Sequence, residues 1–187
     1  MDSIISYIEK NFSEKRKIHT EGVRVTAVHL AEKYGESTEK AQTAALFHDM
    51  FRGVPVDVVN YYVKHLELGE KYMNNCNLAH GKIAAIMMER DFDIKDEDIL
   101  NAVKFHTTGR AGMSKLEKII YIADAIEPNR KYPGVDELRE IAERNLDEAV
   151  LASLNHTIDF VQNQGNFLDE DTIHAKEYLE KEILNGK

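Results

Sequence analysis

The six residues Ala44-Ala45-Leu46-Phe47-His48-Asp49 place an apolar run directly before two adjacent side chains that can bind a metal. Residues three and four apart share a helix face, so a helix that buries Ala44 and Ala45 also turns His48 inward. An unpaired buried polar group costs about 2–7 kcal/mol. The stretch therefore predicts a helix whose end presents a His–Asp pair to a partner inside the protein.

The composition is that of a globular protein, with 187 residues, of which 43% are hydrophobic and 30% are charged. This length suits a single domain. The net charge of −9 argues against a protein that coats nucleic acid. Cys76 is the only cysteine, so no intrachain disulfide forms. We find no signal peptide and no apolar run of the ~20 residues that a membrane span needs, and we expect a cytoplasmic protein with no membrane partner.

Apolar residues recur at helical spacing along almost the whole chain, and no alternating run indicates a strand, so we predict an all-α fold. Gly35 is placed to end a helix over 14–34. Ser114-Lys115-Leu116-Glu117 is a capping box that begins another helix. Near the end of the chain we predict one long helix over 136–165 and a last helix over 169–184.

Five of the predicted helices carry metal-binding side chains on or beside their apolar faces. These side chains are His19, His48 with Asp49, His80, His106 and Asp124. One such histidine is most often a packed core residue, and a purely structural role for the whole set is the alternative. Helix bundles, however, build metal sites from facing helices. The coincidence of five therefore favours a metal or catalytic centre, and imidazole with carboxylate suits iron or manganese better than zinc.

The order His19, His48-Asp49, Asp124 resembles the H…HD…D pattern of the HD-domain metal-dependent phosphohydrolases. The flanking sequence is similar to the YqeK subfamily in seven segments: RKIHTEGV (16–23), ALFHD (45–49), AHG (79–81), FHTTGRAGMS (105–114), EKIIYIAD (117–124), IEPNR (126–130) and YPGVD (132–136). The likeness spans about 15–180. It implies an HD-domain helical bundle with additional C-terminal helices, as a single domain over 1–187 with a metal core over about 15–130 and C-terminal helices over about 135–185.

Members of this subfamily are symmetrical diadenosine tetraphosphate hydrolases, which release two ADP. The resemblance implies that the cofactor is iron, with manganese or another divalent metal as the alternative. The implied metal ligands are His19, His48, Asp49 and Asp124. His80 and His106 match histidines that lie close to the metal and the phosphates, where related HD proteins bind a second metal, and the number of ions stays open. A homodimer is also expected from the resemblance.

Hydrolysis of a phosphoanhydride needs neutralised charge and a nucleophile, and a metal ion supplies both. We expect Asp49 to bind the metal and orient the attacking water, and His80 and His106 to hold the phosphate or protonate the leaving ADP. The expected substrate contacts, besides these two histidines, are Arg52, Thr107, Arg130 and Phe167, and Arg110 is a further candidate for phosphate charge. Arg52 stands where the resemblance predicts a lysine, and Phe167 would stack on a base.

Two other functions remain open at this point. The same site could hydrolyse a different nucleotide: a mononucleotide, a deoxynucleoside triphosphate or a cyclic dinucleotide. The chain could also be a nucleotide-binding or partner-binding module without catalysis, whose histidines and aspartates serve the fold alone. Analysis of the products formed from diadenosine tetraphosphate distinguishes these hypotheses.

Overall fold

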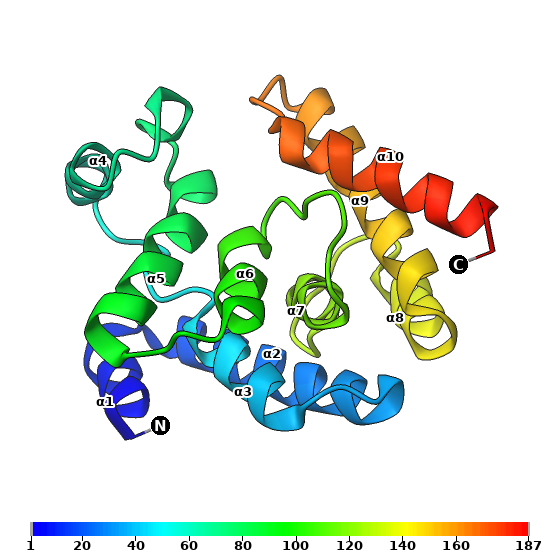
Figure 1. The fold of residues 1–187 in the computed structure, drawn as a ribbon, viewed down its shortest axis with the longest axis horizontal. Helices are drawn as coiled ribbons and strands as arrows, with labels where there is room; N and C mark the ends of the chain where they lie inside the picture. The colour runs from blue at the N-terminus through cyan, green and yellow to red at the C-terminus, as the bar shows by residue number, and fades with distance from the viewer. Residues whose placement is uncertain (1, 187) are drawn as a thin grey trace.

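The computed structural model describes residues 2–186, and within them the chain forms ten α-helices, one short 3-10 helix and no strand (Figure 1). The all-α prediction is confirmed. The helices are α1 (Asp2–Asn11), α2 (Glu14–Tyr34), α3 (Thr38–Phe47), α4 (Val56–His65), η1 (Glu70–Tyr72), α5 (Cys76–Phe92), α6 (Glu97–Phe105), α7 (Lys115–Ile126), α8 (Val135–Arg144), α9 (Leu146–Asn163) and α10 (Glu170–Leu184).

Helix α7 occupies the centre of the molecule and is seen end-on in the middle of Figure 1. It packs against α2, α3, α6, α8 and α9. Leu116, Ile119, Ile120 and Ile122 on this helix are fully buried. A helix that is apolar on nearly all sides belongs in a core, and this one holds Asp124 among the surrounding helices.

The helix ends follow the local signals of the sequence. Gly35 adopts the left-handed conformation (φ 66°) and ends α2, where a residue with a Cβ would be strained. The Ser114 side chain accepts from the Glu117 backbone N–H, and the Glu117 side chain accepts from the Ser114 backbone N–H. This capping box fixes where α7 begins and therefore the register that carries Asp124.

The single long helix predicted over 136–165 is wrong, because the chain breaks at Asn145 into α8 and α9. Asn145 has an extended backbone (φ −151°, ψ 114°), and its side-chain oxygen accepts from the backbone N–H groups of Asp147 and Glu148. Asparagine competes with the helical backbone in this way. A cap followed by two acidic residues is a helix-start signal that the apolar periodicity across 138–161 concealed.

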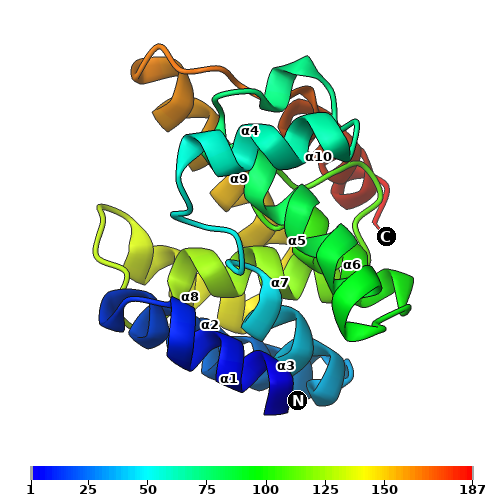
Figure 2. The same cartoon turned by 90° about the vertical axis from the view of Figure 1, so that its left-hand side faces the viewer.

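Two groups of helices flank the metal-binding helices on opposite sides. In Figure 2 the α4–η1 segment crosses the face nearest the viewer, and α9 and α10 lie behind it. The ion pair of Lys71 with Asp169 at 3.1 Å joins these two groups, and the ion pair of Lys82 with Asp171 at 3.4 Å joins α5 to α10. None of the helices within residues 2–186 combines the length and apolar character needed to cross a membrane.

Candidate metal centre

The structure brings together all six metal-binding side chains singled out from the sequence. They come from α2, α5 and α7 and from the turns that end α3 and α6. They form two groups of three, His19 with His48 and Asp124, and Asp49 with His80 and His106. Within each group, one potential ligand atom of every member lies within 4.8 Å of the others.

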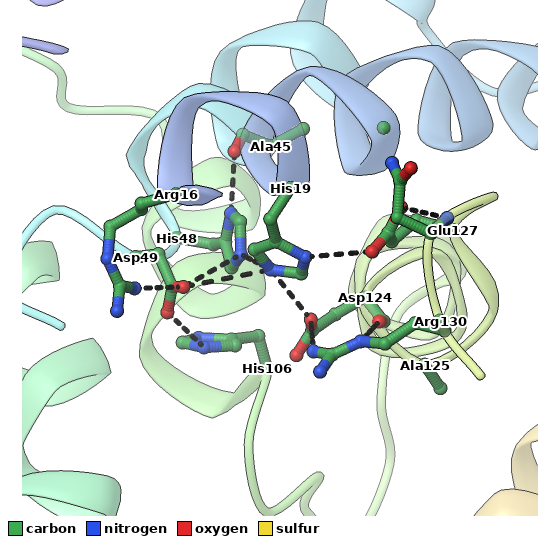
Figure 3. Close-up of polar contacts among 12 residues, drawn as sticks. Arg16, His19, Ala45, His48, Asp49, His106, Asp124, Ala125, Glu127 and Arg130 are labelled. Carbon is green, nitrogen blue, oxygen red and sulfur yellow. Dashed lines mark hydrogen bonds and ion pairs between the residues drawn. The ribbon is translucent and has the colours of Figure 1, made fainter. Parts of the chain in front are cut away.

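Asp49 belongs to the second group but faces both groups (Figure 3). Its Oδ2 is 3.7 Å from Nε2 of His19 and 3.7 Å from Nε2 of His48. Its Oδ1 is 3.2 Å from Nε2 of His80 and 3.9 Å from Nε2 of His106. Each oxygen of one carboxylate therefore serves a different group, which is the arrangement that can bridge two cations.

The histidine rings are held so that Nε2 is the free nitrogen. Nδ1 of His48 donates to the Ala45 carbonyl at 2.6 Å, and Nδ1 of His106 donates to the Val103 carbonyl at 2.7 Å. His80 bonds through Nδ1 in the same way, to a carbonyl four residues before it. A carbonyl can only accept, so these Nδ1 atoms carry the proton and a neutral ring then offers a lone pair at Nε2.

This donor set fits a metal ion. Nε2 of His80 and Nε2 of His106 lie 2.9 Å apart, and Nε2 of His19 and Nε2 of His48 lie 3.3 Å apart. Burial lowers the pKa of His48, and burial together with His80 lowers the pKa of His106 to about 3. Burial thus favours the neutral forms of His48 and His106, whose Nε2 lone pairs can bind a cation, whereas Asp124 and Glu127 raise the pKa of His19 against the effect of burial.

Both carboxylates stay ionised despite their surroundings. Burial alone would raise the pKa of Asp49, but the neighbouring His48 and His80 lower it far below its ordinary value. Burial opposes ionisation of Asp124 in the same way, and His19, His48 and Arg130 lower its pKa. Charged carboxylates and neutral imidazoles are the protonation states that bind metals.

Two arginines contact these carboxylates directly. Arg16 donates from Nη1 to Oδ2 of Asp49 at 2.5 Å, and Arg130 donates from Nη2 to Oδ1 of Asp124 at 2.5 Å. Arg130 also donates from Nε to the Asp124 backbone carbonyl at 2.9 Å. The two guanidinium groups thus hold positive charge beside the ligand groups.

The centre opens into a cavity of about 450 Å³, here called the inner cavity. Four cationic side chains, Lys15, Arg16, Arg52 and Arg130, line it, together with His19, Asp49, His106, Thr107, Tyr121, Asp124 and Thr157. Thr107 lies beside the centre, with its Oγ1 3.2 Å from Nε2 of His106. The inner cavity therefore combines metal-ligand groups with the charge that a polyphosphate requires.

Comparison with known protein families identifies the family of this chain. The model of the HD domain matches residues 16–129. The chain belongs to the HD domain family. The HD pair itself is His48-Asp49, which completes both groups of the centre.

The proteins similar to this HD-domain chain cover nearly its whole length. The symmetrical bis(5'-nucleosyl)-tetraphosphatase of Bacillus subtilis (strain 168) is 37% identical, over 95% of this chain and 96% of its own length. That of Staphylococcus aureus (strain NCTC 8325 / PS 47) is 35% identical, over 91% and 89%. A crystal structure from Clostridium acetobutylicum, described as a predicted HD superfamily hydrolase involved in NAD metabolism, is 47% identical with a TM-score of 0.91, and each chain covers 96% of the other.

Sequence reasoning missed a carboxylate that supports this HD-domain centre. Glu127 is buried, and its Oε1 accepts from Nδ1 of His19 at 3.2 Å. Its Oε2 accepts from the backbone and side chain of Asn129 at 2.7 and 3.0 Å. A Cβ at Gly22 would collide with Oε2 of Glu127, so any larger residue there would force this carboxylate to shift. The available signal in the sequence was a glutamate directly after the apolar end of the helix, at Ile126-Glu127.

The structure places only some of the arginines predicted as phosphate contacts at the inner cavity. Arg16 was quoted only within a similar segment, yet it contacts Asp49. Arg110, a candidate for phosphate charge, is instead bound by the buried Glu117 through Nε and Nη2 at 2.7 and 2.6 Å, and it does not line the inner cavity. Phe167 also lies outside the inner cavity, in a second cavity that adjoins it. Arg52 and Arg130 line the inner cavity, and their contacts with phosphate stay a prediction.

Proposed function

We propose that this HD-domain protein is a symmetrical bis(5'-nucleosyl)-tetraphosphatase that hydrolyses diadenosine tetraphosphate to two ADP. The observation that carries this proposal is a carboxylate, Asp49, shared by two histidine groups at the edge of a cavity that four cationic side chains line. The named relatives of nearly equal length support the substrate. The resemblance of the FHTTGRAGMS and IEPNR segments to the YqeK subfamily points to the same reaction.

We assign the ligands as two sets. His19, His48, Asp124 and Oδ2 of Asp49 would hold one ion, and Oδ1 of Asp49 with His80 and His106 would hold a second. When bound, such ions polarise a phosphoryl oxygen and lower the pKa of a water molecule. Iron is our proposal for the metal, with manganese the main alternative for imidazole and carboxylate ligands. Elemental analysis of protein purified without added metal tests the identity and the count.

The catalytic residues of the proposal are Asp49, His80 and His106. Because Nδ1 of His80 and Nδ1 of His106 donate to backbone carbonyls while both Nε2 atoms face Asp49, these histidines suit ligand roles better than proton donation to ADP. Asp49 then fixes the distance between the two sets. This revises the general-acid role weighed above for the two histidines.

Charge on the tetraphosphate would be met by the cationic side chains of the inner cavity. Arg52 and Arg130 are the proposed phosphate contacts, and the planar guanidinium can bind two phosphate oxygens at once. Arg16 joins them from the structure. The Thr107 hydroxyl, beside His106, can donate to a phosphate oxygen.

The decisive experiment is chromatography of the products from diadenosine tetraphosphate. Symmetrical cleavage gives ADP alone, at two molecules per substrate consumed. Equal amounts of AMP and ATP would reject symmetrical cleavage. The protein could instead prefer mononucleotides, deoxynucleoside triphosphates or cyclic dinucleotides, and this result would favour the hypothesis of a different nucleotide hydrolase. If metal-loaded protein turned over no nucleotide, the hypothesis of a non-catalytic module would be favoured.

We further propose the organisation of the molecule around this reaction. The chain acts as one domain over 1–187, in which the metal core over 15–130 performs the chemistry and the C-terminal helices over 135–185 supply substrate contacts. Limited proteolysis that yields no protease-resistant fragment shorter than the folded chain would support one domain. A cytoplasmic location and a homodimer complete the proposal; cell fractionation tests the first and analytical ultracentrifugation the second.

A further inference from the structure

A second cavity of about 650 Å³, here called the outer cavity, adjoins the inner one. Arg52, Thr107 and Thr157 line both, so the two spaces meet at these three residues. One wall of the outer cavity comes from the segment 71–78, which links η1 to α5, and the other from the segment 157–172, which links α9 to α10. Its size falls within the range of about 300–1,000 Å³ that small-molecule sites occupy.

The walls of the outer cavity carry exposed aromatic rings. Phe160 is 64% exposed and Phe167 is 56% exposed, and both line this cavity. The other five phenylalanines of the chain are buried or half-buried. Both exposed rings stand beside the turn between α9 and α10. Two exposed rings gathered at one cavity suit a flat, apolar ligand face.

The same walls offer amides. Asn74, Asn75, Asn77 and Asn166 line the outer cavity. Asn74 and Asn75 use their side-chain oxygens within the fold, as partners of Asn60 and Leu78. The side chains of Asn77 and Asn166 make no hydrogen bond within residues 2–186. Each amide presents both donors and an acceptor, as the edge of a nucleobase does.

The two cavities differ in the charge of the side chains that line them. Lys15, Arg16, Arg52 and Arg130 line the inner cavity. In the outer cavity the additional cation is Lys71, and its ammonium is already paired with Asp169 at 3.1 Å. The inner cavity thus suits phosphates, and the outer cavity suits an uncharged, aromatic group attached to them.

We propose that the outer cavity is a nucleoside subsite, in which Phe160 and Phe167 stack on one nucleobase of the dinucleoside tetraphosphate. The polyphosphate then passes Arg52 and Thr107 into the inner cavity. The proposal rests on the function proposed above and deepens it. It makes the recognition of a symmetrical substrate asymmetric, since one nucleoside meets two phenylalanines and the other lies on the opposite side of the metal centre.

A fluorescence titration tests this placement. The chain contains no tryptophan, so the variant Phe167→Trp introduces a single indole. We expect ADP to change its fluorescence and inorganic diphosphate to leave it unchanged, because only ADP carries a base that can stack. The matched control is Tyr61→Trp on α4, at a residue that is also 56% exposed but does not line the cavity. Its fluorescence should respond to neither ligand.

Kinetics give the second test. The double variant Phe160→Ala with Phe167→Ala should lower kcat/KM for diadenosine tetraphosphate about 10- to 100-fold, mainly through KM. Replacing both rings by tyrosine should restore it, while Tyr61→Ala should behave as the unaltered protein. Full activity of the double alanine variant, or an indole unresponsive to ADP in an active enzyme, would overturn the subsite alone. Absence of dinucleoside hydrolysis by the unaltered protein would instead overturn the proposed function.

Discussion

The inner and outer cavities hold their side chains in different ways. In the inner cavity His106 is only 3% exposed, and a hydrogen bond from its Nδ1 to the Val103 carbonyl fixes the ring. In the outer cavity Phe160 and Phe167 are more than half exposed. The comparison teaches that buried hydrogen bonds restrain the groups proposed for the chemistry, whereas the groups proposed for recognition keep conformational freedom until a ligand orders them.

The largest expected effect comes from the residue that both ligand groups share. Asp49→Ala removes the carboxylate that faces four Nε2 atoms, and it leaves Arg16 without its partner. We expect loss of bound metal and of measurable turnover together. Elemental analysis and the product assay measure the two. The control is Asp57→Ala, at an exposed aspartate on α4. An Asp49→Ala variant with full metal and full activity would contradict the assignment.

Removing a residue that orients a metal ligand should reduce metal affinity and activity less than removing the ligand itself. Glu127→Ala deletes the carboxylate that accepts from Nδ1 of His19. We expect about a 10- to 100-fold loss of metal affinity or activity, as for other groups that orient a metal-binding histidine. Glu143→Ala is the matched control, because Glu143 pairs in the same way with His29 on the surface. Equal behaviour of the two variants would show that the pairing of His19 with Glu127 is dispensable.

Metal removal should lower stability as well as activity, because the ligands lie on separate helices. A ligand present at about 1,000 times its Kd stabilises the folded state by about 4 kcal/mol. For a chain of this size the loss corresponds to about 8–16 °C in Tm. Differential scanning calorimetry with and without chelator measures it. The variant Phe160→Ala, which alters only the outer cavity, should show the same shift; a Tm indifferent to chelator would count against the metal centre.

The smallest effect concerns the helix that carries Asp124. Ser114→Ala breaks the capping box at the start of α7. We expect a loss of about 1 kcal/mol in the free energy of unfolding and about 2–4 °C in Tm, with turnover retained, since α7 is held by packing on several sides. Urea denaturation and the product assay check both parts. A large loss of activity at unchanged stability would mean that the cap positions the centre directly.

Much of the fold could be predicted because its signals are local. Helical spacing of apolar residues, the glycine at 35 and the Ser114 capping box each act within a few residues, and the structure follows them. The one long helix over 136–165 failed because periodicity across the break outweighed the cap at Asn145. The pairing of Arg110 with Glu117 could not be predicted for another reason: burial of that glutamate, seven residues away, depends on how α7 packs against its neighbours.

The sequence by itself determined the kinds of ligand and even the ring orientation of three histidines. His48, His80 and His106 bond carbonyls three or four residues earlier, which any helical turn provides. Only the tertiary structure decided that Asp49 faces two groups and that Glu127, 108 residues from His19, orients that ring. The physical reason is range: a helix dictates geometry over a few residues, whereas contacts between helices depend on how all of them pack.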